Sequence, residues 1–270
     1  MPVERRTTYQ RVFGRVKISI VTATYNAAHT LRDTIESVLA QDYADIEYIV
    51  VDGVSSDDTV TLLQSYEPRF DGRMRWISEP DKGIYDAMNK GIRMATGDVV
   101  GTVNSDDFYN HDDVISRVAE CFADSTVQAV YGDVRFVRPD DLNRTIRYYS
   151  SQRFTPRKFR YGWMPAHPTF FTYRHFFDDY GYYRTDYRIA ADYELLIRFL
   201  YTYQLCARYL AYDFIKMRTG GASTSSWRSN WLLNREIVRA CRENGIYTNM
   251  PMVMMKYFIK IFEYLNPDKK

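Results

Sequence analysis

The sequence predicts an α/β fold in which a doubly wound, mostly parallel sheet carries helices on both faces. Its first half predicts this, because short apolar runs alternate there with segments of helical periodicity. Such alternation is typical of parallel strands joined by right-handed crossovers. The length also fits, since 270 residues with 46% hydrophobic content can form one large α/β domain with a helical appendage at its C-terminus.

Four apolar runs in the first half predict strands, at residues 18–22, 46–51, 74–78 and 99–103. A helix is expected after each of the first three. Thr30 should cap the first of these helices, with Asp33 in a position typical of a capping box. The second should span residues 57–66, and the third, with Ile84, Met88, Ile92 and Ala95 on its buried face, should end at Gly97.

The second half is less regular. Its expected elements are a helix at 111–122, sheet segments at 127–131 and 133–137, and helices at 193–203 and 229–244. Residues 139–165 are polar, aromatic and rich in arginine, and we expect them to form loops.

Composition and charge exclude several classes of protein. A net charge of +2 gives no global electrostatic reason to bind nucleic acid. Three scattered cysteines fit a reducing compartment better than a disulfide framework. We expect a cytoplasmic protein, because the N-terminus has no apolar core of a signal peptide and no window has the ~20 apolar residues of a spanning helix.

Polar residues stand at the ends of the first two predicted strands. Ligands of open α/β sheets bind where the carboxyl ends of the strands meet. Asp52 could accept hydrogen bonds there from a base or ribose, or it could serve the turn that Asp-Gly favours. Thr22, Thr24 and Tyr25 should line the same pocket, unless they only pack the strand.

Acidic residues also follow the fourth predicted strand, in Asn104-Ser105-Asp106-Asp107. A carboxylate in that place can hold a hard divalent cation against phosphate oxygens, and Asp106 is the candidate ligand. Asp107 either orients a substrate or caps the next helix.

Asp81-Lys82-Gly83 precedes the third predicted helix. Gly83 allows close approach of the backbone, and the start of a helix favours anions. A phosphorylated ligand is therefore expected beside this loop.

Together these motifs resemble family 2 glycosyltransferases of the GT-A fold, in the exopolysaccharide, O-antigen and capsule branch. The resemblance is strong over residues 17–110 and weaker over 160–225. It rests on four segments in order: Ser19–Asn26, Val50–Thr59, Ser78–Gly91, and Ala95–Asp98 with Asn104–Asp107.

The resemblance implies roles for the donor side. Asp52 would bind the nucleotide base, typically uracil, and the loop at Asp81 would meet nucleotide and donor sugar, flanked by Asp86 and Asn89. Asp106 would bind Mn2+ or Mg2+ as the second acid of an Asp-x-Asp motif. Asn104 stands in place of the first acid and is a weaker ligand, so it could instead touch the ribose or sugar.

It also implies a general base, Asp192, which would take the proton of the acceptor hydroxyl. Relatives have a Glu-Asp pair here, and Ala191 replaces the Glu. The alternative for Asp192 is a helix cap, and Glu194 is the fallback base.

Three weaker candidates would meet the acceptor or the diphosphate. His167 follows the irregular region, and Lys216 and Arg218 lie where relatives have a flexible loop over the diphosphate. A structural histidine and a solvated loop are the alternatives.

The expected function is inverting transfer of one sugar from a nucleotide-sugar, with a UDP-sugar as the expected donor, to a glycan acceptor on a polyprenyl lipid, in surface polysaccharide assembly. A degenerate sugar-nucleotide-binding module or a sugar nucleotidylyltransferase is the alternative. The catalytic domain should span 1–225, with its nucleotide-sugar half at about 17–110 and its acceptor half at 111–225, followed by the appendage at 226–270.

The segment 250–265 predicts an amphipathic helix with a broad apolar face. It could pack on the catalytic domain, insert shallowly at the inner face of the cytoplasmic membrane, or form a homodimer contact.

Overall fold

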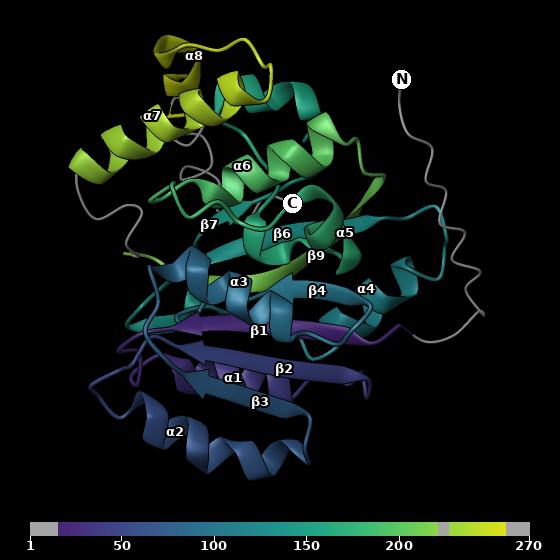
Figure 1. Cartoon of the computed structure of the whole chain (residues 1–270), viewed down its shortest axis with the longest axis vertical. Helices are drawn as coiled ribbons and strands as arrows, with labels where there is room; N and C mark the ends of the chain where they lie inside the picture. The colour runs from purple at the N-terminus through teal and green to yellow at the C-terminus, as the bar shows by residue number, and fades with distance from the viewer. Residues whose placement is uncertain (1–15, 221–226, 258–270) are drawn as a thin grey trace.

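A computed structural model describes residues 16–220 and 227–257 (Figure 1). Its centre is a nine-stranded sheet in the order β3-β2-β1-β4-β8-β6-β9-β5, with β7 paired to β6. The strands are β1 (Ile18–Thr24), β2 (Ile46–Asp52), β3 (Met74–Ser78), β4 (Val99–Thr102), β5 (Phe108–Tyr109), β6 (Ala129–Arg138), β7 (Asp141–Tyr149), β8 (Phe171–Tyr173) and β9 (Ala207–Arg218).

The first four of these strands in space, from β3 to β4, are parallel to one another. Beyond β4 the sheet becomes mixed, because β8 runs antiparallel to both β4 and β6. The prediction of a mostly parallel α/β sheet is therefore confirmed for the half that contains the motifs of the expected nucleotide-sugar site.

Helices cover both faces of the sheet. α3 (Ile84–Met94) packs against β1 and β2, and Figure 1 shows it in front of the sheet with α1 (Leu31–Leu39) behind. The remaining helical segments are α2 (Thr59–Tyr66), η1 (Glu67–Phe70), α4 (Val114–Cys121), η2 (Pro156–Tyr161), η3 (His167–Thr169), α5 (His175–Tyr180), α6 (Ala191–Ile197), η4 (Arg198–Thr202), α7 (Trp227–Glu243) and α8 (Met250–Met254).

Glycines allow helix and sheet to approach closely. A Cβ on Gly91 of α3 would lie 2.3 Å from Cγ1 of Val21 in β1. A Cβ on Gly101 of β4 would lie 2.2 Å from the ring of Phe171 in β8. Both distances are below van der Waals contact, so these glycines set the depth of packing around β1 and β4.

Several expected elements differ from the structure. Residues 139–165, expected to be loops, contain β7 and the 3-10 helix η2. The sheet segments at 127–131 and 133–137 form one strand, β6. The helix expected at 193–203 begins at Ala191 and widens into a π-helix at Arg198, and β9 was not predicted at all.

The C-terminal helices lie at one end of the molecule, where α7 packs on α6 and α8 packs on α7 (Figure 1). Of the segment expected to be amphipathic, α8 buries Val253 completely and leaves Met254 and Met255 exposed. Residues 258–265 lie outside the described residues. Within those described, no helix is both long and apolar enough to cross a membrane.

Candidate active site

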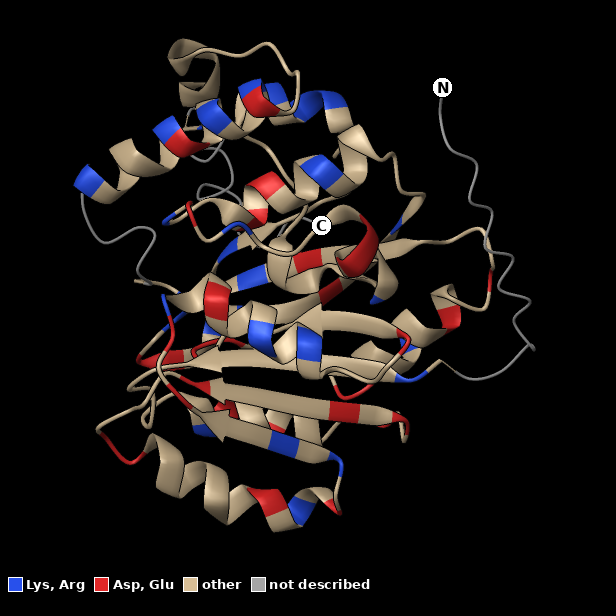
Figure 2. Cartoon of the chain, viewed as in Figure 1, with Lys and Arg blue, Asp and Glu red and all other residues tan. Residues whose placement is uncertain are grey.

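The carboxyl ends of β1, β2 and β3 bring the first candidates together. Thr24 lies beside Asp52, and Asp52 beside Ser78, in the register of the parallel strands. Figure 2 shows acidic residues in the loops at this edge. The edge is where α/β sheets bind ligands, and the topology positions these side chains there.

Asp52 is fully buried and holds the loop that follows β2. Its carboxylate accepts hydrogen bonds from the backbone N–H of Ser55 at 3.0 Å, from the Ser55 hydroxyl, and from the Ser78 hydroxyl at 2.6 Å. A carboxylate has about four acceptor sites. Asp52 therefore stabilises the turn and retains acceptor capacity for a ligand donor.

Thr22, Thr24 and Tyr25 differ in environment. The Thr22 hydroxyl accepts a hydrogen bond from Tyr48 at 3.2 Å inside the core. Oγ1 of Thr24 is buried without a partner among the described residues. Tyr25 is 64% exposed. A buried hydroxyl without a partner is costly, so Thr24 is the one of the three with an unmet hydrogen bond at this edge.

Gly53 marks the closest approach between the loops after β2 and β3. A Cβ there would lie 2.6 Å from Oδ2 of Asp81 and 3.4 Å from the ring of Tyr25. Asp81 in turn accepts a hydrogen bond from the backbone N–H of Gly83 at 2.7 Å. Asp81 and Tyr25 thus converge on the backbone that follows Asp52.

The loop before α3 is exposed at Lys82 and Gly83. Gly83 has φ of 112°, which favours glycine. Asp86 accepts a hydrogen bond from the backbone N–H of Lys82 at 3.0 Å and so folds the loop back on the helix.

Asn89 does not face this loop. Its side chain is buried and exchanges two hydrogen bonds with the backbone of Tyr183, at 2.8 and 2.9 Å. Asn89 therefore connects the chain before α6 to α3. Both expectations for Asn89, a contact with the donor and a place on an exposed polar helix face, are wrong.

The loop after β4 presents Asp106. Its carboxylate is half-buried and has no hydrogen-bond or ion-pair partner among the residues described. Arg218 donates a hydrogen bond to the carbonyl oxygen of Asp106 and pairs with Asp33 of α1. The backbone of this loop is therefore fixed while the carboxylate stays available.

Asp107 points the opposite way, into the core. Burial raises the pKa of its carboxyl, and the neighbouring Asp106 raises it further. The Asn104 amide donates a hydrogen bond to the Asp107 carboxylate at 2.9 Å, and this bond fixes the Asn104 side chain. Ser105, the residue after Asn104, is half-buried. Asp113, and not Asp107, precedes the next helix, α4.

Asp192 lies in the first turn of α6 amid aromatic groups. Its Oδ1 accepts a hydrogen bond from the backbone N–H of Tyr193 at 2.7 Å and lies 3.5 Å from the hydroxyl of Tyr85. Burial raises the pKa of the Asp192 carboxyl, and His167 opposes this rise. An aspartate with a raised pKa is a better proton acceptor than an exposed one.

His167 and Tyr183 connect this group to β4. Nε2 of His167 lies 2.7 Å from the hydroxyl of Tyr183, which also hydrogen-bonds to Thr102 at the end of β4. Burial lowers the pKa of His167, so its ring is neutral near pH 7. Thr102 is the last residue of β4 and lies four residues before Asp106. Because Tyr183 and His167 connect Thr102 to Asp192, Asp192 and the loop of Asp106 lie at the same end of β4.

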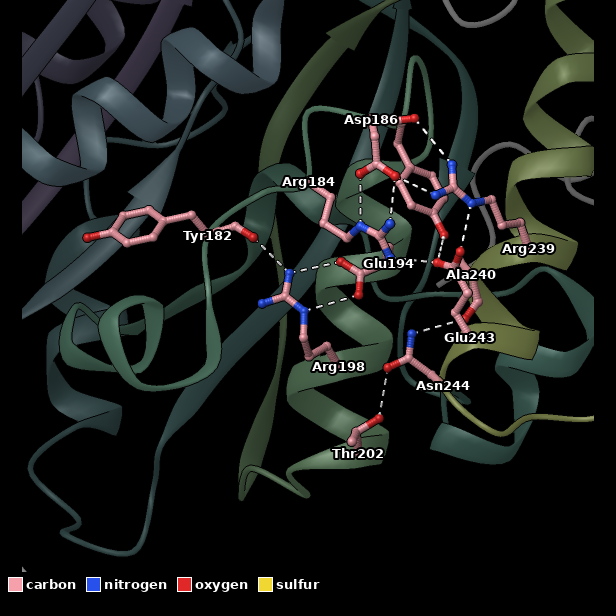
Figure 3. A network of polar contacts seen from close by, with 11 residues as sticks. Tyr182, Arg184, Asp186, Glu194, Arg198, Thr202, Arg239, Ala240, Glu243 and Asn244 are labelled. Carbon is pink, nitrogen blue, oxygen red and sulfur yellow. Dashed lines mark hydrogen bonds and ion pairs between the residues drawn. The ribbon is translucent and has the colours of Figure 1, made fainter.

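Glu194 is placed differently. It is buried, and both its oxygens accept hydrogen bonds from Arg198 at 2.8 and 3.1 Å (Figure 3). Arg198 also binds the carbonyl oxygens of Tyr180, Gly181 and Tyr182. This geometry makes Glu194 of α6 the ion-pair partner of Arg198 at the start of η4.

Lys216 and Arg218 lie in the strand β9, so the expectation of a flexible loop at these residues is wrong. Lys216 pairs with Phe108 of β5 in the sheet, and its ammonium lies 5.9 Å from the ring centre of Phe108. Residues 221–223 of the expected loop lie outside the described residues.

A cleft of about 300 Å³ opens between the start of α3 and the chain before α6. It is lined by Lys82 to Asp86 on one side and Thr185 to Arg188 on the other. The sequence predicted the side formed by residues 82–86 but not the side formed by residues 185–188.

Comparison with known proteins decides the family. The family described as Glycosyl transferase family 2 matches residues 19–181. An uncharacterized glycosyltransferase of Mycobacterium tuberculosis is 36% identical over 184 residues, which are 67% of this chain and 68% of that protein. A PGL/p-HBAD biosynthesis glycosyltransferase of Mycobacterium bovis is 30% identical over 193 residues, 71% of this chain and 73% of that protein.

The chain belongs to glycosyltransferase family 2.

Solved structures with this fold are more distant in sequence. Mannosyltransferase PcManGT from Pyrobaculum calidifontis, in complex with GDP-Man and Mn2+, has a TM-score of 0.65 and 20% identity, covering 84% of this chain and 65% of that one. S. aureus TarS 1–349 in complex with UDP-GlcNAc has a TM-score of 0.63 and 17% identity, covering 83% and 66%. The chain spans 40% of a longer TarS structure. These likenesses establish the GT-A fold for this glycosyltransferase.

The residues of the glycosyltransferase fit a metal only in a limited way. In the described part of the chain, no three His, Cys, Asp or Glu side chains cluster as a metal site. Asp106 is a single available carboxylate. Mg2+ in phosphate sites is often held by one or two carboxylates, with phosphate and water completing the shell. Asp106 thus suits a cation that arrives with a diphosphate.

Two tyrosines of the site were missed in the sequence. Tyr85 lies within a motif of the glycosyltransferase family, but nothing in the sequence indicated that its hydroxyl reaches Asp192. Tyr183 lies in a tyrosine-rich stretch without distinguishing periodicity, and only the fold brings it to His167.

Proposed function

We propose that this glycosyltransferase moves one sugar from a nucleotide-sugar, with a UDP-sugar as the first candidate, to a hydroxyl of a glycan acceptor, with inversion at the anomeric carbon. The observation that carries the proposal is the placement of Asp192. It lies near the end of β4 and beside the start of α3, in surroundings that raise its pKa. An inverting transfer needs such a base on the acceptor side.

In this proposal the nucleotide lies along the carboxyl ends of β1 to β3. Asp52 and Thr24 offer hydrogen-bonding groups to base and ribose, and Asp81 and Tyr25 close over the same loop. The start of α3 and the Lys82 side chain face the diphosphate, since free N–H groups and a cation favour phosphate there.

On the acceptor side, Asp192 takes the proton as the hydroxyl oxygen attacks the anomeric carbon. Tyr85 and the neutral His167 orient the groups around Asp192. Asp106 would hold Mn2+ or Mg2+, and such a cation, when bound, offsets the charge of the departing diphosphate.

The experiment is a panel of UDP-glucose, UDP-galactose, UDP-N-acetylglucosamine and GDP-mannose, each incubated with the protein and Mn2+ while release of nucleoside diphosphate is measured. Turnover of one donor, lost in Asp192→Asn and Asp106→Ala, supports the proposal. Binding of a donor without turnover under any metal supports the alternative of a degenerate binding module. Membership in family 2 removes the support for a nucleotidylyltransferase.

We propose further that the acceptor is lipid-linked and that the protein meets an anionic membrane surface through α7 and α8. A groove of about 480 Å³ on α7 is lined by Trp231, Arg235 and Arg242 among others, and Trp231 is 58% exposed. Figure 2 shows basic residues along this helix. Arginines beside an exposed tryptophan suit the headgroup region of a membrane.

Co-sedimentation with vesicles of phosphatidylglycerol and phosphatidylcholine tests this. Wild type should sediment with anionic vesicles and the variant Arg235→Gln/Arg242→Gln should not. Equal sedimentation of both proteins contradicts a contact through this groove, and a concentration-dependent dimer without vesicle binding favours the homodimer contact.

A further inference from the structure

The residue that precedes the helix of Asp192 supplies no capping side chain, although Asp192 itself accepts the backbone N–H of Tyr193. α6 begins after Ala190, whose side chain cannot accept a hydrogen bond, and no side chain at this position caps the helix. The first N–H groups of a helix need partners, and their partial positive charge favours a carboxylate. Ala191, the first residue of the helix, is fully buried and has no polar side chain.

A carboxylate from α7 binds the backbone just before this helix. Glu236 is buried, and its Oε1 accepts a hydrogen bond from the backbone N–H of Arg188 at 2.8 Å. Its Oε2 accepts hydrogen bonds from the N–H groups of Ile189 at 2.9 Å and Ala190 at 2.8 Å. One side chain, 46 residues further along the chain than Ala190, thus holds the three residues that precede the helix of Asp192.

The same segment is held on its other side by the donor half. The hydroxyl of Tyr85, in the first turn of α3, donates a hydrogen bond to the carbonyl oxygen of Ile189 and lies 3.5 Å from Asp192. The segment before Asp192 therefore lies between a carboxylate of α7 and a phenol of α3.

A second set of contacts links α7 to the chain just before this segment. Arg239 binds Asp186 and Glu243, and Glu243 binds Arg184 at 2.6 Å and the hydroxyl of Tyr187 at 2.7 Å (Figure 3). The charged groups of this set are half-exposed, so their ion pairs are screened by water. The buried bonds of Glu236 lie closer to Asp192 in sequence and are not screened in this way.

We propose that Glu236 is a positioning residue for the reaction: its carboxylate holds the start of α6 from α7 and so sets the position of Asp192. This inference rests on the proposed role of Asp192 as the general base. It assigns a function to the C-terminal helix α7 that no motif in its sequence indicates.

The proposal has a consequence for pH dependence. The titratable groups that face Asp192 are Tyr85 from α3, His167 from η3 and Tyr183 from the preceding chain, and Glu236 lies behind the segment. Burial raises the pKa of Asp192. Removing the Glu236 charge, and loosening the segment so that water reaches Asp192, both lower that pKa.

The test compares Glu236→Gln with two controls in a donor-hydrolysis assay from pH 4 to pH 9, using UDP-glucose or whichever donor of the panel turns over. Glu120→Gln makes the same change at an exposed residue of α4, and Ile237→Val weakens packing on α7 next to Glu236. Circular dichroism and thermal unfolding confirm that each variant is folded before rates are compared.

Glu236→Gln should lower kcat about 10- to 100-fold, which is the loss expected when a catalytic group is misplaced. The donor KM should stay unchanged, and the acidic limb of the pH profile of kcat should move to lower pH. Both controls should keep the wild-type limb. If Glu236→Gln does not fold, Glu236→Asp, which keeps the charge and shortens the reach, should lower kcat and move the limb less.

A folded Glu236 variant with a wild-type limb and kcat within twofold of wild type overturns the inference. If Asp192→Asn is inactive at the same time, the proposed function stands and only the role of Glu236 is wrong. If Asp192→Asn is as active as wild type, the proposed function itself fails.

Discussion

Replacing Arg198 by methionine should destabilise the protein strongly. Arg198 exposes only 13% of its side chain and Glu194 only 3%, and the two are bound bidentately within α6 and η4 (Figure 3). Methionine keeps most of the apolar volume but removes the guanidinium. The Glu194 carboxylate is then left buried without its partner, and the carbonyl oxygens of residues 180–182 lose their donor.

The size of the loss follows from this burial. Removing one partner of a buried ion pair costs about 3–5 kcal/mol, because the remaining charge stays desolvated. An exposed pair contributes less than about 1 kcal/mol. Arg69, which is 49% exposed and pairs with the 50% exposed Glu36, offers the matched control Arg69→Met.

Urea denaturation followed by circular dichroism measures both losses. Arg198→Met should lower the free energy of unfolding by about 3–5 kcal/mol and Tm by roughly 6–20 °C. Adding Glu194→Leu should recover part of that loss, because the uncompensated charge is gone. A loss in Arg198→Met no larger than in Arg69→Met refutes the assignment of Glu194 to a structural ion pair.

Three further predictions concern the site. Asp106→Asn should abolish turnover, and it should remove the effect of Mn2+ on UDP binding measured by calorimetry, because the amide lacks the charge. If this variant still turns over in the presence of a chelator, Asp106 is not the metal ligand. Gly53→Ala should raise the donor KM, because the new Cβ would lie 2.6 Å from the carboxylate of Asp81 and displace it. Tm should stay unchanged, because that carboxylate is the flexible end of a side chain. An unchanged KM would place the donor elsewhere. The transfer rate should fall on acidification, because protonated Asp192 cannot act as a base. The pH at half-maximal rate should lie above 3.8, the ordinary pKa of aspartate, because burial raises the pKa of Asp192. A half-maximal rate at or below pH 3.8 contradicts a buried base.

The strands β1 and β2 could be predicted because their burial is complete. All seven residues of β1 and of β2 are buried, so both strands are rich in apolar residues and contain only two charged ones, Glu47 and Asp52. By contrast, most positions of β7 and β9 are exposed or half-exposed, and both strands contain arginines and tyrosines. Their pairing with β6 comes from the tertiary structure, which no local pattern of the sequence reports.

The candidate site was predictable where it depends on strand ends and not where it depends on long-range contacts. Asp52 and Asp106 follow strands, and the structure places them at the predicted edge of the sheet. Asn89 was expected beside the donor because it shares a motif with Asp81, yet its partner is the backbone of Tyr183, 94 residues away. Glu236 lies on an ordinary amphipathic helix, and its role emerges only from three backbone contacts.

The most direct test of the account is the rate of a single turnover by Asp192→Asn with donor in excess of its Kd. The amide keeps the shape of the side chain but cannot take a proton, so the rate should fall at least about 10²-fold, while the Kd for UDP stays that of wild type. Glu120→Gln serves as the matched control, with both values unchanged. A rate in Asp192→Asn within threefold of wild type would contradict the assignment of Asp192 as the base and, with it, the proposed inverting mechanism.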